Sequence, residues 1–354
     1  MKRKNVLTVL CLSVVAAMLM LAAGCGSQQS QNEVQQSQKE AQQSQNSTQQ
    51  ASTQQNQKTD FPTKPIRLIM PYSAGGGSDV LARKLADSAN KYLPNNQTVV
   101  VENKTGGAGV VGTTELVGST PDGYTIEEAV NGVLTFQPHF GKTTYTYSDV
   151  KPIAGLTAVP NIFVVKADSK IKSFDDWIAY TKENPGKFSY GTIGKGSFAH
   201  VAAEGVANKA GIKLNCVQFD GAAPAITALM GDHVMGAALL ATDAKSYVDS
   251  GDLRVIYTTV ETSMYPDAVT PRSKGIDFEI VAWTGLFAPK DTPDEVVNII
   301  SDAYKKTLED PEVVKTFESM GYTPQYKDAG EYAKIIEDEF KSNEQVLKSI
   351  GLIK

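Results

Sequence analysis

The sequence predicts an α/β protein, and three observations support this fold class. Short runs rich in β-branched residues alternate with helix-like patterns, an arrangement that builds parallel sheets. A glycine-rich turn at residues 71–79 separates the first of these runs from the first helical pattern. Residues 61–354 number 294, which is enough for one large domain or for two lobes with separate cores. We expect two lobes.

The expected strands and helices follow in order along the chain. The apolar spacing within residues 80–93 predicts the first helix, and another should begin near Ser173. After Pro293 the chain is expected to be helical to its end. Strands are predicted at residues 66–70, 98–102, 124–129, 162–166, 188–191, 214–219, 234–240, 255–259 and 284–288.

The N-terminal residues have the pattern of an export signal. Three basic residues at positions 2–4 precede an uncharged apolar run at residues 6–21, which ends in Leu-Ala-Ala-Gly-Cys. Small residues directly before a cysteine predict a lipoprotein signal peptide at residues 1–24 and lipidation of Cys25. The alternative, a membrane-spanning anchor, needs about 20 apolar residues and no cleavage pattern. Two acyl chains on Cys25 would hold the mature protein on the membrane, outside the cytoplasm.

The next segment, residues 25–60, is dominated by Gln, Ser, Asn and Thr. Such a composition cannot bury enough apolar surface to offset the loss of chain entropy on folding. We therefore expect a tether between the lipid anchor and the folded part.

Net charge and cysteine content argue against some classes of function. Removing residues 1–24 takes away three basic residues and no acidic ones, so the formal net charge changes from −5 to −8. An acidic chain with scattered lysines is a poor nucleic-acid binder. With Cys11 in the signal and Cys25 lipidated, only Cys216 remains, so no intrachain disulfide is expected. Cys216 lies in a strand-like run and is expected to be a small buried apolar residue rather than a nucleophile.

The glycine-rich turn at residues 71–79 is a candidate anion-binding loop. It connects a predicted strand to a predicted helix, and a helix N-terminus presents unpaired N–H groups and a partial positive charge. Glycine has no Cβ, so a bound group can approach the backbone closely. The residues alone indicate a carboxylate or phosphate site of unspecified use.

Several motifs, in the same order along the chain, resemble the Bug/TctC family, the solute-binding proteins of tripartite tricarboxylate transporters. The resemblance spans the whole folded region. It departs from the family pattern at residues 103–109, where Asn-Lys-Thr-Gly-Gly-Ala-Gly stands in place of the frequent Asn-Arg-Pro-Gly-Ala-Gly-Gly. The matching segments are residues 64–67, 71–79, 100–103, 107–109, 121–125, 184–187, 190–197 with His200, and 221–224.

The resemblance implies a periplasmic-binding-protein-like fold of type II, with two lobes and a central interlobe cleft. Lobe 1 would comprise residues 61–161 and 283–354, and lobe 2 residues 162–282. The family captures small organic acids, commonly di- and tricarboxylates, and delivers them to a membrane permease driven by an ion gradient. The chain is therefore expected to be a monomeric extracytoplasmic receptor and not an enzyme, with neither cofactor nor metal.

The resemblance also implies how the ligand is held. Backbone amides of two loops, one from each lobe and each leading into a helix, should contact the carboxylates of the ligand. The helix after the second loop is expected at residues 198–210. The predicted ligand-binding residues are Tyr72, Ser73, Ala74, Gly75, Gly76, Gly77, Ser78, Asp79, Gly194, Lys195, Gly196, Ser197, His200 and Asp220.

Some of these residues also have structural interpretations. Asp79 could orient loop water, or it could complement the dipole as an acidic residue of the first helical turn. Ser78 and Ser197 are each expected to be helix N-caps, which can still donate a backbone N–H to a ligand.

Three further residues are predicted to contact the ligand, and for two of them a purely structural role is the alternative. Lys195 is predicted to add a cation for a second carboxylate, or else to be a solvated loop lysine. His200 has no obvious acidic partner, so packing on its helix is the alternative to ligand contact. Asp220 is expected to face the cleft and to select substituents on the ligand.

One motif supports a competing hypothesis. Residues 107–112 satisfy G-x-G-x-x-G after a strand-like run, and Glu127 or Glu128 lies at about the distance of a ribose-binding acid. The alternative function is therefore a nicotinamide-dependent oxidoreductase. It conflicts with export, because a tethered extracytoplasmic protein would have no ready cofactor supply. The sequence contains no G-x-S-x-G, H-E-x-x-H or CxxC motif, and its three histidines are widely spaced.

Overall fold

The computed structural model describes residues 60–354, and the structural findings concern this part of the chain. The predicted signal peptide, the lipidation of Cys25 and the tether up to residue 59 lie outside the described residues. Within residues 60–354, no helix is both long enough and apolar enough to cross a membrane.

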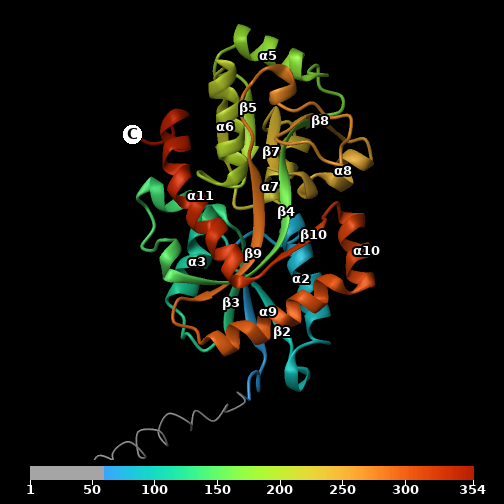
Figure 1. Ribbon diagram of the computed structural model, residues 1–354. Helices are drawn as coiled ribbons and strands as arrows, with labels where there is room; N and C mark the ends of the chain where they lie inside the picture. Colours follow the sequence, from blue (N-terminus) through green and yellow to red (C-terminus); the bar gives the residue numbers. More distant parts are fainter. Residues whose placement is uncertain (1–59) are drawn as a thin grey trace, which may run out of the picture. The chain divides into compact units, whose positions relative to one another are not determined.

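Strands and helices alternate along the described chain (Figure 1). The strands are β1 (Ile66–Met70), β2 (Val99–Asn103), β3 (Thr125–Val130), β4 (Val150–Lys166), β5 (Ser189–Thr192), β6 (Asn215–Gln218), β7 (Gly236–Leu240), β8 (Leu253–Thr258), β9 (Val281–Pro289) and β10 (Pro324–Lys327). The α-helices are α2 (Gly77–Ala89), α3 (Val110–Val117), α4 (Gly132–Thr135), α5 (Phe174–Glu183), α6 (Phe198–Ala210), α7 (Ala222–Met230), α8 (Lys245–Asp249), α9 (Asp294–Glu309), α10 (Pro311–Met320) and α11 (Ala329–Ser349).

The strands pair in the order β2-β1-β3-β9-β4-β7-β5-β6. Strand β1 pairs in parallel with β2 and β3, and β5 pairs in parallel with β6 and β7. The long strand β4 joins the two groups: residues 150–160 pair with β9, and residues 161–166 pair with β7 and β8. Figure 1 shows β4 and β9 running between a lower part, built on β1–β3, and an upper part, built on β5–β8.

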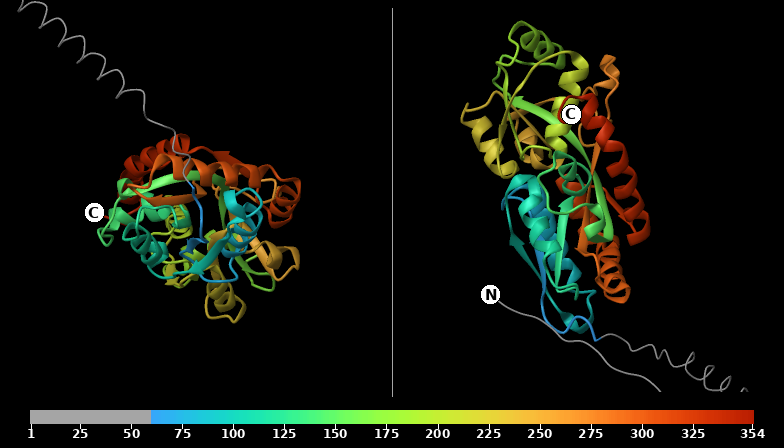
Figure 2. Two further views of the ribbon diagram at one scale, coloured as in Figure 1. Left: turned by 90° about the horizontal axis from the view of Figure 1, so that it is seen from below. Right: turned by 90° about the vertical axis from the view of Figure 1, so that its left-hand side faces the viewer.

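We call the part built on β1–β3 lobe 1 and the part built on β5–β8 lobe 2. The chain is a two-lobed α/β protein of the type II periplasmic-binding-protein class, as the sequence predicts. The exact boundaries, residues 61–161 with 283–354 and residues 162–282, remain a prediction. Helix α11 lies along lobe 1 and brings the C-terminus to the level of lobe 2 (Figure 2).

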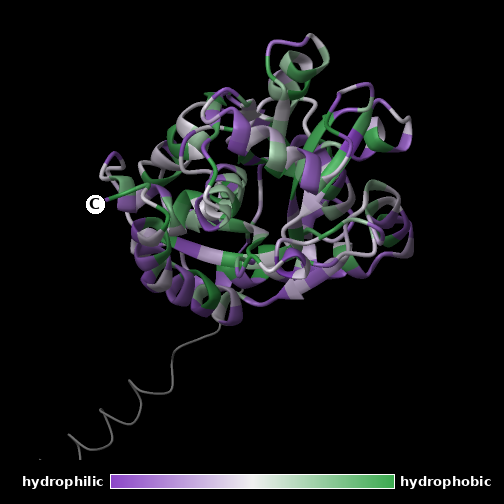
Figure 3. Cartoon of the chain, turned by 90° about the horizontal axis from the view of Figure 1, so that it is seen from above, coloured by the Kyte–Doolittle hydropathy of each residue, from purple (hydrophilic) through white to green (hydrophobic). Residues whose placement is uncertain are grey.

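Helices cover both faces of the lobe 1 sheet. On one face, Leu68 and Met70 pack with apolar residues of α2, α9 and α10. On the other, Ile69, Ala129 and Phe287 pack with residues of α3 and α11. Hydrophobic segments accordingly concentrate inside the fold, and the outer helices carry the hydrophilic segments (Figure 3).

Local sequence explains where several elements begin and end. Strand β1 is almost wholly buried, which fits an apolar run covered on both faces. Ser173 and Ser197 cap α5 and α6, because their side chains accept N–H bonds from Asp176 and His200. Helix α6 ends at Gly211, whose φ of 68° lies in the left-handed region that favours glycine. The predicted helix at residues 198–210 and the predicted cap at Ser197 are confirmed.

Three sequence predictions were wrong or incomplete. The chain after Pro293 is not helical throughout, because Pro324 begins β10, a short strand that pairs with β4. Strand β4 starts 12 residues before the predicted position, since Pro152 and Pro160 weaken the strand pattern and the register shifts near Gly155. Ser78 is not an N-cap: Gly76 holds that position and Ser78 lies inside α2.

Candidate ligand-binding site

The carboxyl ends of the parallel strands in both lobes lead to the loops predicted to bind the ligand. Strand β1 ends at Met70 and leads through residues 71–76 into α2, and β5 ends at Thr192 and leads through residues 193–197 into α6. In α/β proteins, ligands bind at this end of the sheet. Each loop contacts the other lobe, because a Cβ on Gly221 of lobe 2 would touch Ser73 of the first loop, and one on Gly194 of the second loop would touch Ala108 of lobe 1.

The first loop is held by side chains of the adjoining elements α2 and β2. Asp79 is 3% exposed, and its carboxylate accepts the Gly75 N–H (3.0 Å), the Asn103 amide (2.8 Å) and the Arg83 guanidinium. Burial raises the pKa of Asp79, but these hydrogen bonds outweigh it and lower the pKa below its ordinary value. Asp79 is therefore an acidic first-turn residue that fixes the loop, in line with the dipole interpretation.

The second loop is held by His200, a residue of the first turn of α6. The His200 ring is 4% exposed, and its Nδ1 accepts the Gly196 N–H at 3.1 Å. Burial first, and the Lys195 charge second, lower the pKa of His200 to about 4, so the ring is neutral and can accept this bond. Gly194 and Gly196 have φ of 98° and 78°, which glycine adopts without strain. His200 thus has a structural role.

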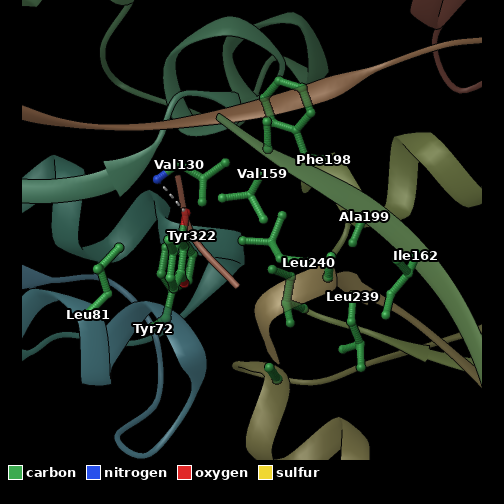
Figure 4. Packing of buried hydrophobic residues seen from close by; sticks show 14 of the residues in the cluster. Tyr72, Leu81, Val130, Val159, Ile162, Phe198, Ala199, Leu239, Leu240 and Tyr322 are labelled. Atoms are coloured by element: carbon green, nitrogen blue, oxygen red, sulfur yellow. Dashed lines mark hydrogen bonds between the residues drawn. The ribbon is translucent and has the colours of Figure 1, made fainter. Parts of the chain in front are cut away.

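The loops share one small enclosed cavity between the lobes. Tyr72 from the first loop and Ser197 from the second both line it, together with Ala108, Ile193 and Leu240 among others. Figure 4 shows Tyr72, Val130, Phe198 and Leu240 gathered here, with the Val130 N–H donating to the Tyr72 hydroxyl. The volume of about 10 Å³ admits roughly one water molecule. The lobes therefore leave no room for a ligand at this point.

Three other predicted residues line a larger groove outside the cavity. Gly194, Lys195 and Asp220 border a hollow of about 1090 Å³ that runs between the lobes toward the C-terminal residues. Lys195 and Asp220 are exposed, and the Lys195 Nζ lies 5.9 Å from the centre of the Phe140 ring. The Lys195 carbonyl accepts the Gln137 side-chain N–H at 2.6 Å, which ties the two lobes together.

The glycines of the first loop face a third hollow, of about 340 Å³. Gly75, Gly76 and Gly77 line it with residues of α7, α8 and α10. The Gly77 N–H donates to the carboxylate of Asp243 (2.9 Å), a residue of lobe 2 that follows β7. Ala74 is exposed and Ser78 is buried in the helix. Eight of the fourteen predicted residues therefore line one of these three hollows, and Tyr72 and Ser197 alone share the enclosed one.

Unpartnered polar groups mark the same edge of both sheets. Among the described residues, the structure gives no hydrogen-bond partner to the Ser73 hydroxyl, the Thr192 hydroxyl or either polar atom of the Asn161 amide. Asn161 is 1% exposed and lies where β4 changes from pairing with β9 to pairing with β7. Buried polar groups are normally paired, so these three are candidates for contact with a ligand or water.

Asn161, Gln137 and Asp243 were not predicted as site residues from the sequence. The polar residue after a β-strand is a usable signal for Asp243, which follows β7 at the carboxyl edge. No local signal identifies Asn161, because its position depends on the change of strand partners within β4.

The structure does not favour the dinucleotide interpretation of residues 107–112. Glu127 and Glu128, the candidate ribose acids, lie inside β3 and are 0% and 1% exposed. Glu127 accepts a hydrogen bond from Thr113 of α3. Gly112 instead permits close packing, because a Cβ there would lie 2.8 Å from the Pro71 side chain.

A comparison with models of known protein families finds one that matches most of this chain. The model described as the tripartite tricarboxylate transporter family receptor matches residues 81–352. A protein of Cupriavidus necator, described as the UPF0065 protein in gbd 5′region, is 34% identical over 303 residues. That alignment covers 85% of this chain and 91% of the relative.

Solved structures show the same fold. The periplasmic binding protein BugD is 27% identical with a TM-score of 0.78, over 83% of this chain and all of that one. MatC from Rhodopseudomonas palustris, solved with bound malate, is 24% identical with a TM-score of 0.76, over 81% of this chain and all of that one. At that identity MatC shows the fold alone.

Proposed function

Because the chain belongs to the tripartite tricarboxylate transporter receptor family, we propose that it binds a small carboxylate between its two lobes and delivers it to a transporter permease. We place this activity outside the cytoplasm and assign it no catalytic step. The ligand class is di- or tricarboxylate-like.

One observation carries the proposal: the loops that lead into α2 and α6, helices of opposite lobes, line a shared interlobe cavity. Tyr72, five residues before α2, and Ser197, directly before α6, line that cavity. A helix N-terminus stabilises an anion through unpaired N–H groups and its dipole. The unpartnered Ser73 and Thr192 groups add donors and acceptors near these strand ends, and Asn161 adds an amide where β4 pairs with the end of β7.

Binding in the enclosed cavity requires the lobes to separate. A cavity of about 10 Å³ is far smaller than the roughly 300–1000 Å³ of ordinary ligand sites. The two strands β4 and β9 connect the lobes and serve as the hinge in this proposal. A ligand with higher affinity for one lobe arrangement shifts the population toward it, so the closed, occupied form is the one that the permease recognises.

The lipid anchor belongs to the same proposal. Lipidation of Cys25 and the tether at residues 25–60 would keep a monomeric receptor within reach of the permease. Metabolic labelling with a palmitate analogue tests this, and a Cys25→Ala variant should lose the label.

The function is tested with a thermal-shift screen of the full-length protein against malate, succinate, citrate, benzoate and amino acids. A specific ligand raises stability by mass action, by about 2.7 kcal/mol at 100 times its Kd. Calorimetry then measures the Kd of each hit. The proposal fails if no carboxylate raises the melting temperature or binds in calorimetry.

A further inference from the structure

Asp243 places a carboxylate of lobe 2 on the first residue of helix α2 in lobe 1. Its Oδ1 accepts the Gly77 N–H at 2.9 Å, and its Oδ2 accepts the Leu240 N–H at 3.3 Å. A Cβ on Gly77 would lie 2.8 Å from the same Oδ1. The acid therefore packs directly against the backbone at the start of the helix.

This contact occupies the N-terminus of α2, one of the two helix starts that could hold a ligand carboxylate. The N-terminus of α2 carries unpaired N–H groups and a partial positive charge, and Asp243 is an anion that neutralises it. Two more donors of the loop also have acceptors, since Gly75 donates to Asp79 and Gly76 to the Ser73 carbonyl. A ligand carboxylate at this end must compete with groups of the protein itself.

The start of α6 differs, because its caps are uncharged. The Ser197 hydroxyl accepts the His200 N–H at 3.2 Å, and the neutral His200 ring accepts the Gly196 N–H. The nearest charged residue of that loop is Lys195, a cation. The two helix starts are therefore unequal: the α6 end favours an anion, whereas the α2 end already holds one.

Burial of the acid shows that this arrangement is energetically unfavourable for Asp243 itself. Desolvation raises its pKa to about 6, although the bonds from Gly77 and Leu240 act in the opposite direction. A neutral residue at this position would avoid that cost.

We propose that Asp243 determines the charge pattern of the ligand, because its carboxylate competes with a second ligand carboxylate for the N-terminus of α2. The inference rests on the proposed function but revises its ligand class, from di- and tricarboxylates to acids with a single carboxylate. A ligand with one carboxylate binds through the α6 end. A hydroxyl or ammonium group at its other end can donate to Asp243, whereas a dicarboxylate must displace it. Hydroxy acids and amino acids are therefore the favoured class.

Two sets of acids with matched chain lengths test the proposal by calorimetry on the full-length protein. One set is butyrate, succinate and 4-aminobutyrate; the other is hexanoate, adipate and 6-aminohexanoate. Asp243→Asn keeps the shape and removes the charge. We expect roughly tenfold tighter dicarboxylate binding, weaker binding of the amino acids and little change for the monocarboxylates. Asp243→Ala should show the same order, and melting temperatures check that both variants fold.

Asp249→Asn is the matched control, because Asp249 lines the same hollow but pairs with Lys245 at 2.6 Å. It should leave all six affinities unchanged. The inference is overturned if the Asp243 variants shift all acids equally, shift none, or bind neither succinate nor adipate. These outcomes leave the proposed function standing as long as the wild-type protein binds any carboxylate of the wider panel. If it binds none of them, the proposed function itself has failed.

Discussion

Glu127 and Glu128 are neighbouring acids in the middle strand of lobe 1, with both side chains inside the fold. Burial raises the pKa of each to about 8. The two oxygens of Glu128 have no hydrogen-bond partner among the described residues. A protonated carboxyl avoids burying a charge, so both acids should be neutral in the native protein near neutral pH.

This burial predicts how stability depends on pH. Below about pH 4.5 Glu128 is protonated in both states, and up to about pH 8 it keeps its proton only in the native state. The native state binds more protons in this window, so the free energy of unfolding falls as pH rises through it. Urea unfolding at about pH 5.5 and about pH 8 should show higher stability at the lower pH.

Glu128→Gln should reduce that difference, because glutamine has no proton to lose. Glu102→Gln is the control: hydrogen bonds from Arg67 first and Lys104 second lower the pKa of Glu102 to about 2, so it stays charged throughout the window. An unchanged difference in the Glu128 variant would contradict a protonated Glu128.

Lys195 is the one side-chain cation among the predicted site residues, and its charge is exposed to solvent. If it attracts a ligand carboxylate, Lys195→Ala should weaken diacid binding by roughly two- to fivefold, the range for an exposed charge pair. Lys209→Ala, in the last turn of α6, removes an equal charge away from the groove. Equal affinities of both variants and the wild type would show that Lys195 is a solvated loop residue.

At the scale of elements, patterns local in sequence predicted more than patterns set by packing. The run at β1, the cap at Ser197 and the end of α6 depend on adjacent residues and were predicted correctly. Strand β10 and the first half of β4 depend on pairing between residues about 170 positions apart, such as Pro324 with Thr157. Single-sequence periodicity does not contain that information.

The loops of the site also combine features that adjacent residues determine with contacts that long-range packing determines. Their glycines and serines identified where the chain turns, but not which loop of the other lobe each one contacts. The contact of Asp243 with Gly77 joins residues 166 positions apart and depends on how the lobes close. The three hollows could not be predicted for this reason.

The contact between the loops 193–197 and 107–109 gives a prediction about closure. A Cβ on Gly194 would lie 2.7 Å from the Ala108 Cβ and 2.9 Å from its backbone N, which leaves no flexible group to move aside. Gly194→Ala should therefore hold the lobes apart, seen as a larger radius of gyration in solution scattering. We expect ligand affinity to fall roughly tenfold.

Gly186→Ala is the control that separates an effect on lobe closure from an effect of backbone strain. Gly186 has a φ of 73°, and a Cβ there would meet no atom within 4 Å. Alanine at that position costs about 1 kcal/mol of backbone strain but should change neither scattering nor affinity. Identical behaviour of the two variants would refute the contact at Gly194 as a determinant of closure.

At the scale of the whole molecule, the fold class follows from the order of strands and helices, and the two lobes follow from the path of β4 and β9. Both carboxyl edges face the interlobe cavity, which Tyr72 and Ser197 line from opposite sides. Lobe separation and closure then connect ligand binding to the recognition step that we propose for the permease.

The most direct measurement is a crystal structure of the protein with the tightest-binding acid of the screen. We predict a ligand between the lobes, with a carboxylate within hydrogen-bond distance of the loop at residues 193–197 and the start of α6. A ligand bound elsewhere, with the cavity beside Tyr72 and Ser197 still closed, would contradict it.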